Sequence, residues 1–333
     1  MAMITSTYPE LTVCGVENWI QEEADNVMVK TLLSKLFSVE TTNKLFEDDS
    51  SWSGIDYPEL VGESAASPED ELLIGYTYRY ELNTYKRKMA ISSLLNKVDQ
   101  YSIAQAEDMS RELARKAAQG RDINAFSIFR NAFDNTVLYG DGMPLISVQH
   151  PRKDGGTAQR NTFLDGVQDA LSYDALKDLE DVMYEVFSNK GIPLNIGLES
   201  KLILMVTPYN REEALQIAEA DMVPGSVDES VNYFKGRNMD VLVNPYMSWR
   251  FAYNRGETAS TDRVTYDKRY FLIDPSFTGR LLKFKQLQNF EIKAWEDEDT
   301  DVMYAKVADV YAYGVSGWQG IVGSLGDGST HTA

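Results

Sequence analysis

The sequence is poor in the residues that carry most metal and nucleophilic chemistry. Among its 333 residues are one cysteine, Cys14, and two histidines, His150 and His331. A single cysteine excludes a disulfide framework within the chain and fits a reducing compartment. We expect Cys14 to be a half-buried, unreactive thiol, because no histidine is near it in sequence.

Basic residues are also few. Lysine and arginine number 32 against 51 acidic residues, a net charge of -19. Proteins that grip nucleic acid normally present a basic face, so we expect no high-affinity DNA binding. No apolar run approaches the roughly 18 residues of a membrane span, and the first residues lack the pattern of a signal peptide. We therefore expect no membrane association.

Catalytic and phosphate-binding motifs are missing as well. The P-loop, the dinucleotide-binding glycine pattern and the G-x-S-x-G elbow do not occur, and DGGT at 154–157 is typical of a turn. A hydrolase triad would have to use His150 as its base. His150 precedes Pro151, which favours an extended backbone and a structural or solvent-facing histidine. We expect no enzyme and no cofactor.

An acidic segment near residue 300 is the one candidate for metal. Asp297, Asp299 and Asp301 have the first spacings of a calcium loop. However, Val302 stands where that loop needs glycine, and Ala308 stands where it needs glutamate. A solvated acidic turn is the preferred interpretation, and a cation between subunits is the alternative.

The residues that are present predict an ordered chain with one unusual hairpin. Hydrophobic residues make up 43% and charged residues 25%, which are globular values. Over 74–92, Tyr76, Tyr78 and Tyr80 alternate with polar residues, which predicts a strand. It forms one arm of a long hairpin whose polar tip lies around 52–71. Such a hairpin is marginal alone and needs a surface to lie on.

The rest of the chain alternates helix and strand patterns. Apolar spacings of three and four predict a long helix over 102–134, with a kink at Gly120, and a second helix capped by Ser172. Short apolar runs at 201–208 and 239–247 predict buried strands. The fold class is therefore α+β.

Five segments, in this order, resemble the major capsid proteins of tailed bacteriophages with the Hong Kong 97-type fold. Within that family, the resemblance is strongest to the Mu-like major head subunits. The five segments are TYRYELNTYKRKMAISSLLNKVDQ, DGMPLISVQHPRKDGGTAQRN, GIPLNIGLESKLILMVTPYNREEALQIAEAD, VNYFKGRNMDVLVNPYM and WEDEDTDVMYAKVADVYAYGVSGWQGIVGS. Each is loose alone, and together they cover most of the chain, from roughly residue 30 to 322.

The resemblance implies the parts of that fold. They are an N-terminal arm (1–36), an extended β-hairpin loop (37–95), a peripheral domain (96–200) with the spine helix 102–134, an axial domain (201–305), a return strand of the peripheral domain (306–322) and a flexible tail (323–333).

The resemblance also implies a function. The chain would assemble with itself into hexamers and pentamers of an icosahedral head around double-stranded DNA, without binding that DNA tightly. Further partners would be a portal, a scaffolding protein and possibly a decoration protein. Assembly would take place in the bacterial host cytoplasm, and the final location would be the virion. The candidate contacts between subunits are Trp52, Ile55, Tyr57, Leu60, Tyr76, Tyr78 and Tyr80.

Some family members join subunits through a lysine in the extended loop. Here no lysine occurs between Lys44 and Lys86. We therefore expect no covalent cross-link of this kind.

Two other functions stay open at this point. An encapsulin-like compartment shell shares the fold and encloses cargo enzymes. A hydrolase that uses His150 is the third interpretation. The sequence does not distinguish the first two without genomic context, and it does not give the triangulation number, the host or the maturation pathway.

Overall fold

The computed structural model divides the chain into two compact units, each with a sheet and helices of its own. Unit 1 comprises Met1–Glu47, Tyr80–Ala125 and Phe284–Tyr313, and unit 2 comprises Asp48–Arg79, Phe126–Lys283 and Gly314–Ala333. The structure describes residues 13–28, 31–52, 56–62, 66–70, 73–92, 100–198, 200–224, 230–237, 239–256, 266–289, 291–297, 299–300 and 302–331.

Unit 1 is built around a long strand, β10 (Val302–Val315). β10 pairs antiparallel with β4 (Asn83–Ser92) along one side and with β9 (Glu291–Asp297) along the other. The same sheet continues from β10 through β8 (Leu282–Gln286) to β1 (Ser38–Thr41). Among the described strands of this sheet, β4 therefore lies at the edge.

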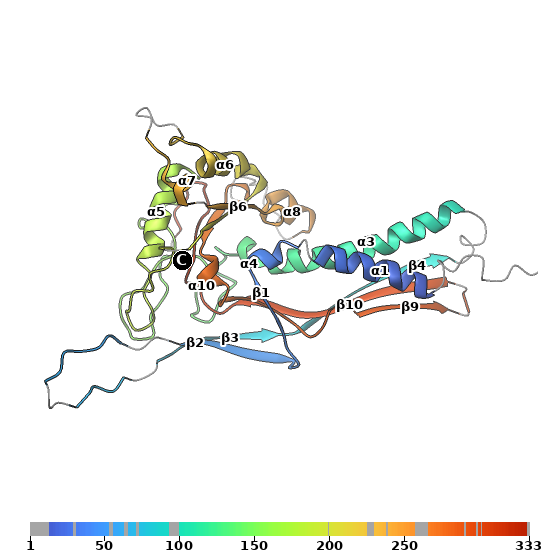
Figure 1. Ribbon diagram of the computed structural model, residues 1–333, viewed down its shortest axis with the longest axis horizontal. Helices are drawn as coiled ribbons and strands as arrows, with labels where there is room; N and C mark the ends of the chain where they lie inside the picture. Colours follow the sequence, from blue (N-terminus) through green and yellow to red (C-terminus); the bar gives the residue numbers. More distant parts are fainter. Residues whose placement is uncertain are drawn as a thin grey trace, which may run out of the picture. The chain divides into compact units, whose positions relative to one another are not determined.

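Two helices cover one face of this sheet. α1 (Val13–Met28) and α3 (Gln100–Ala125) run side by side in Figure 1 and contact each other. A strand turns alternate side chains to opposite faces, so every second residue of β10 joins the helices in one core. That core contains Val16, Ile20, Ala24, Ile91, Ala106, Leu113, Ala114, Met303, Ala305 and Val307.

A buried ion pair ties the helix to the strand. The Arg121 guanidinium of α3 donates from Nε to Asp309 Oδ2 at 2.5 Å and from its second terminal nitrogen to Asp309 Oδ1 at 2.8 Å. Both side chains are only 5% exposed, and Arg121 also donates to Gln286 Oε1 at 3.0 Å. The two-point geometry satisfies both charges, which is the condition for tolerating them in a core.

Unit 2 has a four-stranded sheet in the order β11–β7–β5–β6. β5 (Ile203–Val206) is parallel to β6 (Asp240–Val243) and antiparallel to β7 (Tyr270–Ile273), which pairs antiparallel with β11 (Ile321–Ser324). Its helices and 3-10 turns are α4 (Ser127–Arg130), α5 (Tyr173–Tyr184), η4 (Pro208–Asn210), α6 (Arg211–Glu219), α7 (Tyr233–Arg237), η5 (Pro245–Met247), α8 (Trp249–Asn254) and α10 (Pro275–Thr278).

The predicted helices are confirmed with one change. The Ser172 hydroxyl accepts a hydrogen bond from the Ala175 backbone N–H at 3.1 Å, as expected of a helix cap. The long helix begins at Gln100 and ends at Ala125, and its predicted continuation is the separate short helix α4. Gly120 lies inside α3 rather than at an interruption.

The strand predicted over 74–92 is divided in two. β3 (Ile74–Glu81) ends before Leu82, whose backbone N–H donates to Leu45 O at 3.1 Å, and β4 then continues into the unit 1 sheet. The apolar side chain of Leu82 continues the alternation, so the side-chain pattern carries no sign of this division.

The C-terminal segment is not the flexible tail expected over 323–333. β11 reaches Ser324, and the His331 backbone N–H donates to Gly166 O at 2.8 Å. A bridge also joins Thr330 to Val167. The glycine-rich composition suggested a tail, but Gly326 and Gly328 have positive φ and form turns between paired segments.

Three further expectations concern the first residues and the domains. Cys14 is exposed rather than half-buried, because it lies on the outer side of α1. Part of the N-terminal arm forms α1, which packs on α3. The peripheral and axial assignments stay predictions.

Within the described ranges, no helix is both long and apolar enough to cross a bilayer.

Removing the carboxylate of the buried ion pair should destabilise unit 1 strongly. We expect Asp309→Ala to lower the free energy of unfolding by about 3–5 kcal/mol, because it leaves the Arg121 charge buried and unpaired. Glu112→Ala is the matched control: it removes the partner of Lys116 in an exposed pair, with an expected cost below about 1 kcal/mol. Urea unfolding followed by circular dichroism measures both, and equal losses would contradict the prediction.

Candidate interaction loop and the His150 cluster

The candidate contacts between subunits lie on a long loop between two paired strands. β2 (Phe46–Trp52) and β3 form a two-stranded sheet of their own. At its base the Arg79 guanidinium donates twice to the Asp48 carboxylate, at 2.7 and 2.8 Å. Lys283 Nζ lies 2.7 Å from Asp49. These ion pairs fix the base of the loop within unit 2.

The tyrosines of β3 pack against residues of their own unit. The Tyr78 and Tyr139 rings lie 6.1 Å apart, and Lys153 Nζ lies 4.6 Å from the Tyr76 ring centroid. The backbone approaches closely here, since a side chain at Gly140 would place its Cβ 2.8 Å from Thr77 O. Tyr76 and Tyr78 are therefore half-buried and hold the base of the loop.

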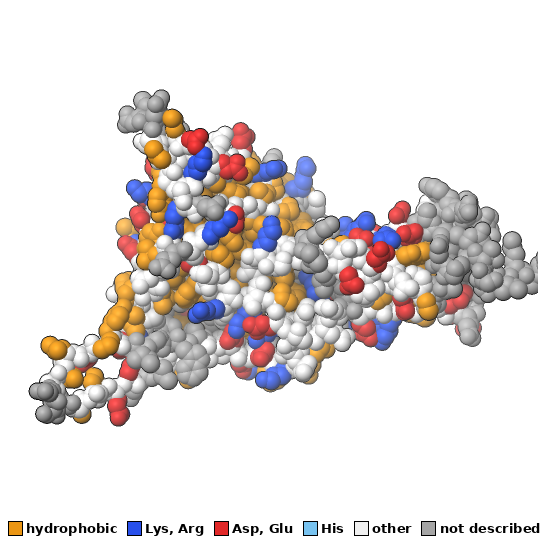
Figure 2. Space-filling view, viewed as in Figure 1, with side chains coloured by type: hydrophobic (Ala, Val, Ile, Leu, Met, Phe, Trp, Pro, Cys, Tyr) orange, Lys and Arg blue, Asp and Glu red, His pale blue; other side chains and the backbone are white. Residues whose placement is uncertain are grey.

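The outer part of the loop exposes apolar side chains. Tyr57 is 64% exposed and Leu60 is fully exposed, with Val61 beside them. Figure 2 shows orange side chains along this segment, which extends beyond β2 and β3 in the view of Figure 1. Exposed apolar groups gathered on one segment are typical of a surface that another molecule covers.

Among the described residues of the acidic tip, the attachment to the rest of its own unit runs through Lys190. Lys190 Nζ forms an ion pair with Asp70 and lies 3.9 Å from Asp56. The Asp56 backbone N–H donates to Asp70 Oδ2 at 2.7 Å. The side chain of Lys190 is only 12% exposed. These contacts hold the two ends of the tip close to each other.

The remaining contact candidates have other positions. Tyr80 is buried in unit 1, with Lys285 Nζ 5.0 Å from its ring. Trp52 is the last residue of β2, but its side chain and all of Ile55 lie outside the described residues. Of the candidates whose side chains are described, Tyr57 and Leu60 are therefore the ones best placed to meet a second molecule.

His150 lies in a buried polar cluster. Its side chain is 1% exposed, and its ring stacks on Trp318 at 4.3 Å with an angle of 12° between the planes. Nδ1 lies 2.7 Å from Asp141 Oδ2 and Nε2 lies 3.2 Å from Asn161 Oδ1. The backbone at His150 is extended, as predicted, and bridges to Gln159.

Both ring nitrogens of His150 face acceptors. The Asn161 amide nitrogen donates to Leu145 O at 2.7 Å and to Ile321 O at 3.1 Å, so its oxygen points to the imidazole. Both ring nitrogens therefore already have an oxygen within hydrogen-bond distance. Neither nitrogen is open to take a proton from a nucleophile, so this geometry does not support His150 as the base of a hydrolase triad.

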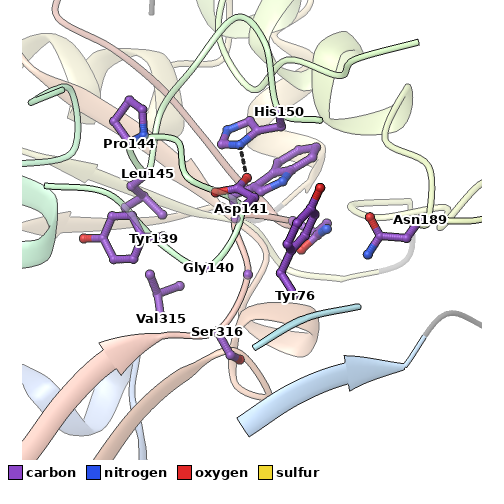
Figure 3. Close-up of a pocket in the computed structure, with 13 residues that line it drawn as sticks. Tyr76, Tyr139, Gly140, Asp141, Pro144, Leu145, His150, Asn189, Val315 and Ser316 are labelled. Carbon is purple, nitrogen blue, oxygen red and sulfur yellow. Dashed lines mark hydrogen bonds and ion pairs between the residues drawn. The ribbon is translucent and has the colours of Figure 1, made fainter. Parts of the chain in front are cut away.

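The space beside this cluster is small (Figure 3). Tyr76, Tyr139, Asp141 and Asn189 line a cavity in which the volume open to water is about 20 Å³. That volume holds about one water molecule. The cluster therefore fastens the segment after the long helix and the base of the loop, and it offers no room for a substrate.

The acidic residues near 300 form a turn. Asp297 accepts from the Asp299 backbone N–H at 3.2 Å and from the Thr300 hydroxyl at 2.8 Å. Asp301 lies outside the described residues. Within the described part of the chain, no three His, Cys, Asp or Glu side chains form a group that could hold a metal ion. The metal interpretation gains no support from this geometry.

Sequence reasoning missed the partners of His150. Asp141 stands in an Asp-Gly pair, which in a sequence is typical of a turn, and it does form one, because its Oδ1 accepts from the Met143 backbone N–H at 3.1 Å. Trp318 is too far along the chain for any spacing rule to connect it with His150.

Substitution of His150 should affect stability. We expect His150→Ala to lower the free energy of unfolding by about 3–5 kcal/mol, because the ring stacked on Trp318 is lost from a closed core. His150→Phe keeps a stacked ring but leaves Asp141 Oδ2 without its imidazole partner, at a cost of about 1–3 kcal/mol, whereas Asn161 Oδ1 still accepts from the Ser147 backbone N–H at 2.8 Å. Urea unfolding separates the two terms, and unfolding midpoints equal to that of the original chain would contradict this role.

Comparison with solved structures places this architecture. A scan against protein-family models and a search of curated proteins found no match. The capsid chain of the native GTA particle matches with a TM-score of 0.55 and 12% identity, over 87% of this chain and 88% of that chain. The mature capsid of bacteriophage PhiM1 matches with a TM-score of 0.56 and 10% identity, over 88% of this chain and 86% of that chain. The capsid of cyanophage P-SCSP1u matches with a TM-score of 0.54 and 10% identity, over 88% of this chain and 87% of that chain. The chain therefore has the fold of phage-type major capsid proteins.

Proposed function

We propose that this chain is the major capsid protein of a tailed bacteriophage and assembles with itself into an icosahedral shell. The observation that carries this proposal is the fold itself, which matches phage capsid chains over 88% of this sequence. The expected arrangement is hexamers and pentamers that enclose double-stranded DNA. The chain would act as a structural protein and not as an enzyme.

The loop supports assembly on physical grounds. Its base is tied to unit 2 by ion pairs, whereas Tyr57 and Leu60 remain in solvent. Covering such side chains with a second copy removes apolar area from water, at about 25 cal/mol per Å². A loop that lies on a different part of the next copy makes a heterologous contact, and such contacts build a closed ring when the rotation between copies closes.

The other partners follow from the same proposal. A portal, a scaffolding protein and a decoration protein would act on the shell. The shell would be assembled in the cytoplasm of the bacterial host and would end in the virion. An encapsulin-like shell is the competing function, and the content of purified particles separates the two: nucleic acid supports the capsid and a cargo enzyme supports the compartment.

The exposed leucine of the loop should matter for assembly and not for folding. We expect Leu60→Asp to reduce shell formation at least tenfold, because it places a charge where apolar area is buried between copies. The conservative Leu60→Met is the control and should assemble normally. Negative-stain microscopy and sedimentation measure shells, and circular dichroism checks the fold. Normal shells from Leu60→Asp would contradict this role of the loop.

The shell should be held together without covalent links. The extended loop has no lysine between Lys44 and Lys86 to form an isopeptide bond. Assembled particles boiled in detergent should therefore run as one monomer band on a denaturing gel. A ladder of linked rings would show that another residue forms the bond.

A further inference from the structure

Three lysines lie in register across three neighbouring strands of unit 1. Lys306 of β10 pairs directly with Lys88 of β4 on one side and with Lys293 of β9 on the other. Directly paired residues point to the same face of a sheet, and neighbouring strands are about 4.8 Å apart. The three side chains therefore form one row, here named the lysine row, on one face.

This face is the one that the helices leave open. Met303, Ala305 and Val307 point into the core with α1 and α3, so the alternate residues Tyr304 and Lys306 point away from it. Lys86 lies on the same open face, because its partner on β10 is Ala308. Figure 1 shows α1 and α3 on one side of β10 and β9.

The lysine row is costly unless an anion meets it. Like charges directly opposite each other on paired strands are destabilising. Lys293 has one carboxylate, Glu291, at 2.5 Å, whereas neither Lys88 nor Lys306 forms an ion pair with a described carboxylate. The hydrogen bond and charge of Lys293, together with the charges of Lys306 and Lys86, lower the pKa of Glu291. One carboxylate thus meets the charges of three of these lysines, and Lys88 is not among them.

Aromatic rings position part of the row. Lys88 Nζ lies 4.2 Å from the Tyr304 ring centroid, and that ring stacks on Trp295 at 5.6 Å. A ring attracts the ammonium group through its face without neutralising the charge. Lys88 is therefore oriented while its positive charge remains available to a ligand.

We propose that the lysine row, with Lys86, is a binding site for the phosphate backbone of nucleic acid. Regularly spaced phosphates supply anions along a line without any sequence requirement, which suits four ammonium groups on a flat sheet face. Binding is weak and depends on salt, because the rest of this chain is acidic. The inference rests on the proposed function only for the source of the phosphates, the DNA that the shell encloses.

An acidic segment of a second copy is the competing occupant, and most of its described ion pairs would have to break for it to bind here. The chain's best candidate is the loop that carries Tyr57 and Leu60. Three of its carboxylates are already paired within unit 2, Asp48 with Arg79, Asp49 with Lys283 and Asp70 with Lys190. Moving them to the lysine row would break those pairs. Nucleic acid brings phosphates without this loss. Glu59 and Glu69 are exposed and form no ion pair with a described residue, so the peptide arm of the test below decides between the two occupants.

The test compares two triple variants of the full chain that have the same net charge. Lys88→Gln/Lys293→Gln/Lys306→Gln removes the row. Lys116→Gln/Lys201→Gln/Lys235→Gln is the control, because these exposed lysines are each paired with a carboxylate, Glu112, Asp240 and Asp221. Unassembled protein is titrated with a 30-base-pair DNA duplex, with the corresponding single strand and with a peptide of residues 56–70, between 50 and 300 mM salt.

The proposal expects the original chain and the control to bind the duplex with a strong dependence on salt. The row variant should bind at least tenfold more weakly at 50 mM salt, and the slope of log affinity against log salt should fall by about 2–3, about 0.9 for each lost phosphate contact. Three results would overturn it: no DNA binding by the original chain, equal losses in both variants, or a loss confined to the peptide.

Assembly of the same proteins, read by negative-stain microscopy, separates the two proposals. Shells from the original chain together with unaltered DNA binding by the row variant would refute the phosphate site alone. Failure of the original chain to form shells, with DNA binding lost in the row variant, would refute the capsid function and keep the site. Single-strand binding without duplex binding would overturn double-stranded DNA as the source.

Discussion

The pairing of β10 is the constraint on which unit 1 depends. This strand of 14 residues uses its backbone groups on both sides, for β4 and β9, and its side chains on both faces. One face buries Met303, Ala305 and Val307 under two helices. A shift of its register by one residue would exchange these residues with Tyr304 and Lys306. The same register places Asp309 against Arg121 of α3. Core, ion pair and lysine row therefore follow from one alignment of strands.

In unit 2, the residues that anchor the base of the loop differ from the residues that the loop exposes to solvent. Charged and aromatic groups at the base, among them Asp48 with Arg79 and Tyr78 with Tyr139, bind it to its own chain. The outer segment has an attachment through Lys190 and leaves Leu60 in water. A rigid base with an exposed apolar end is suited to reach a second copy, since little ordering entropy is lost at the base when the end is covered.

The parts predicted from sequence are those whose signal is local. Alternation over 74–92 indicated strands, and Ser172 marked the start of a helix that the structure confirms. The division at Leu82 was missed because it depends on a backbone bond to Leu45 and not on side-chain type. The C-terminal segment was misread because glycine and serine are common in tails and in turns alike. Only pairing with residues near 167 gives those turns their order.

The features that bear on function also divide into those that the sequence determines and those that only the tertiary structure decides. By itself the sequence determined that the chain lacks the motifs for catalysis, that the loop is acidic and free of lysine, and that five segments follow the order of a capsid fold. These properties depend on composition and neighbouring residues, so the order of the chain is enough to state them. Only the tertiary structure decided that His150 is enclosed by Asp141, Asn161 and Trp318, and that Lys88, Lys293 and Lys306 stand in one row. Long-range packing and strand register create both arrangements, and neither leaves a trace in local spacing.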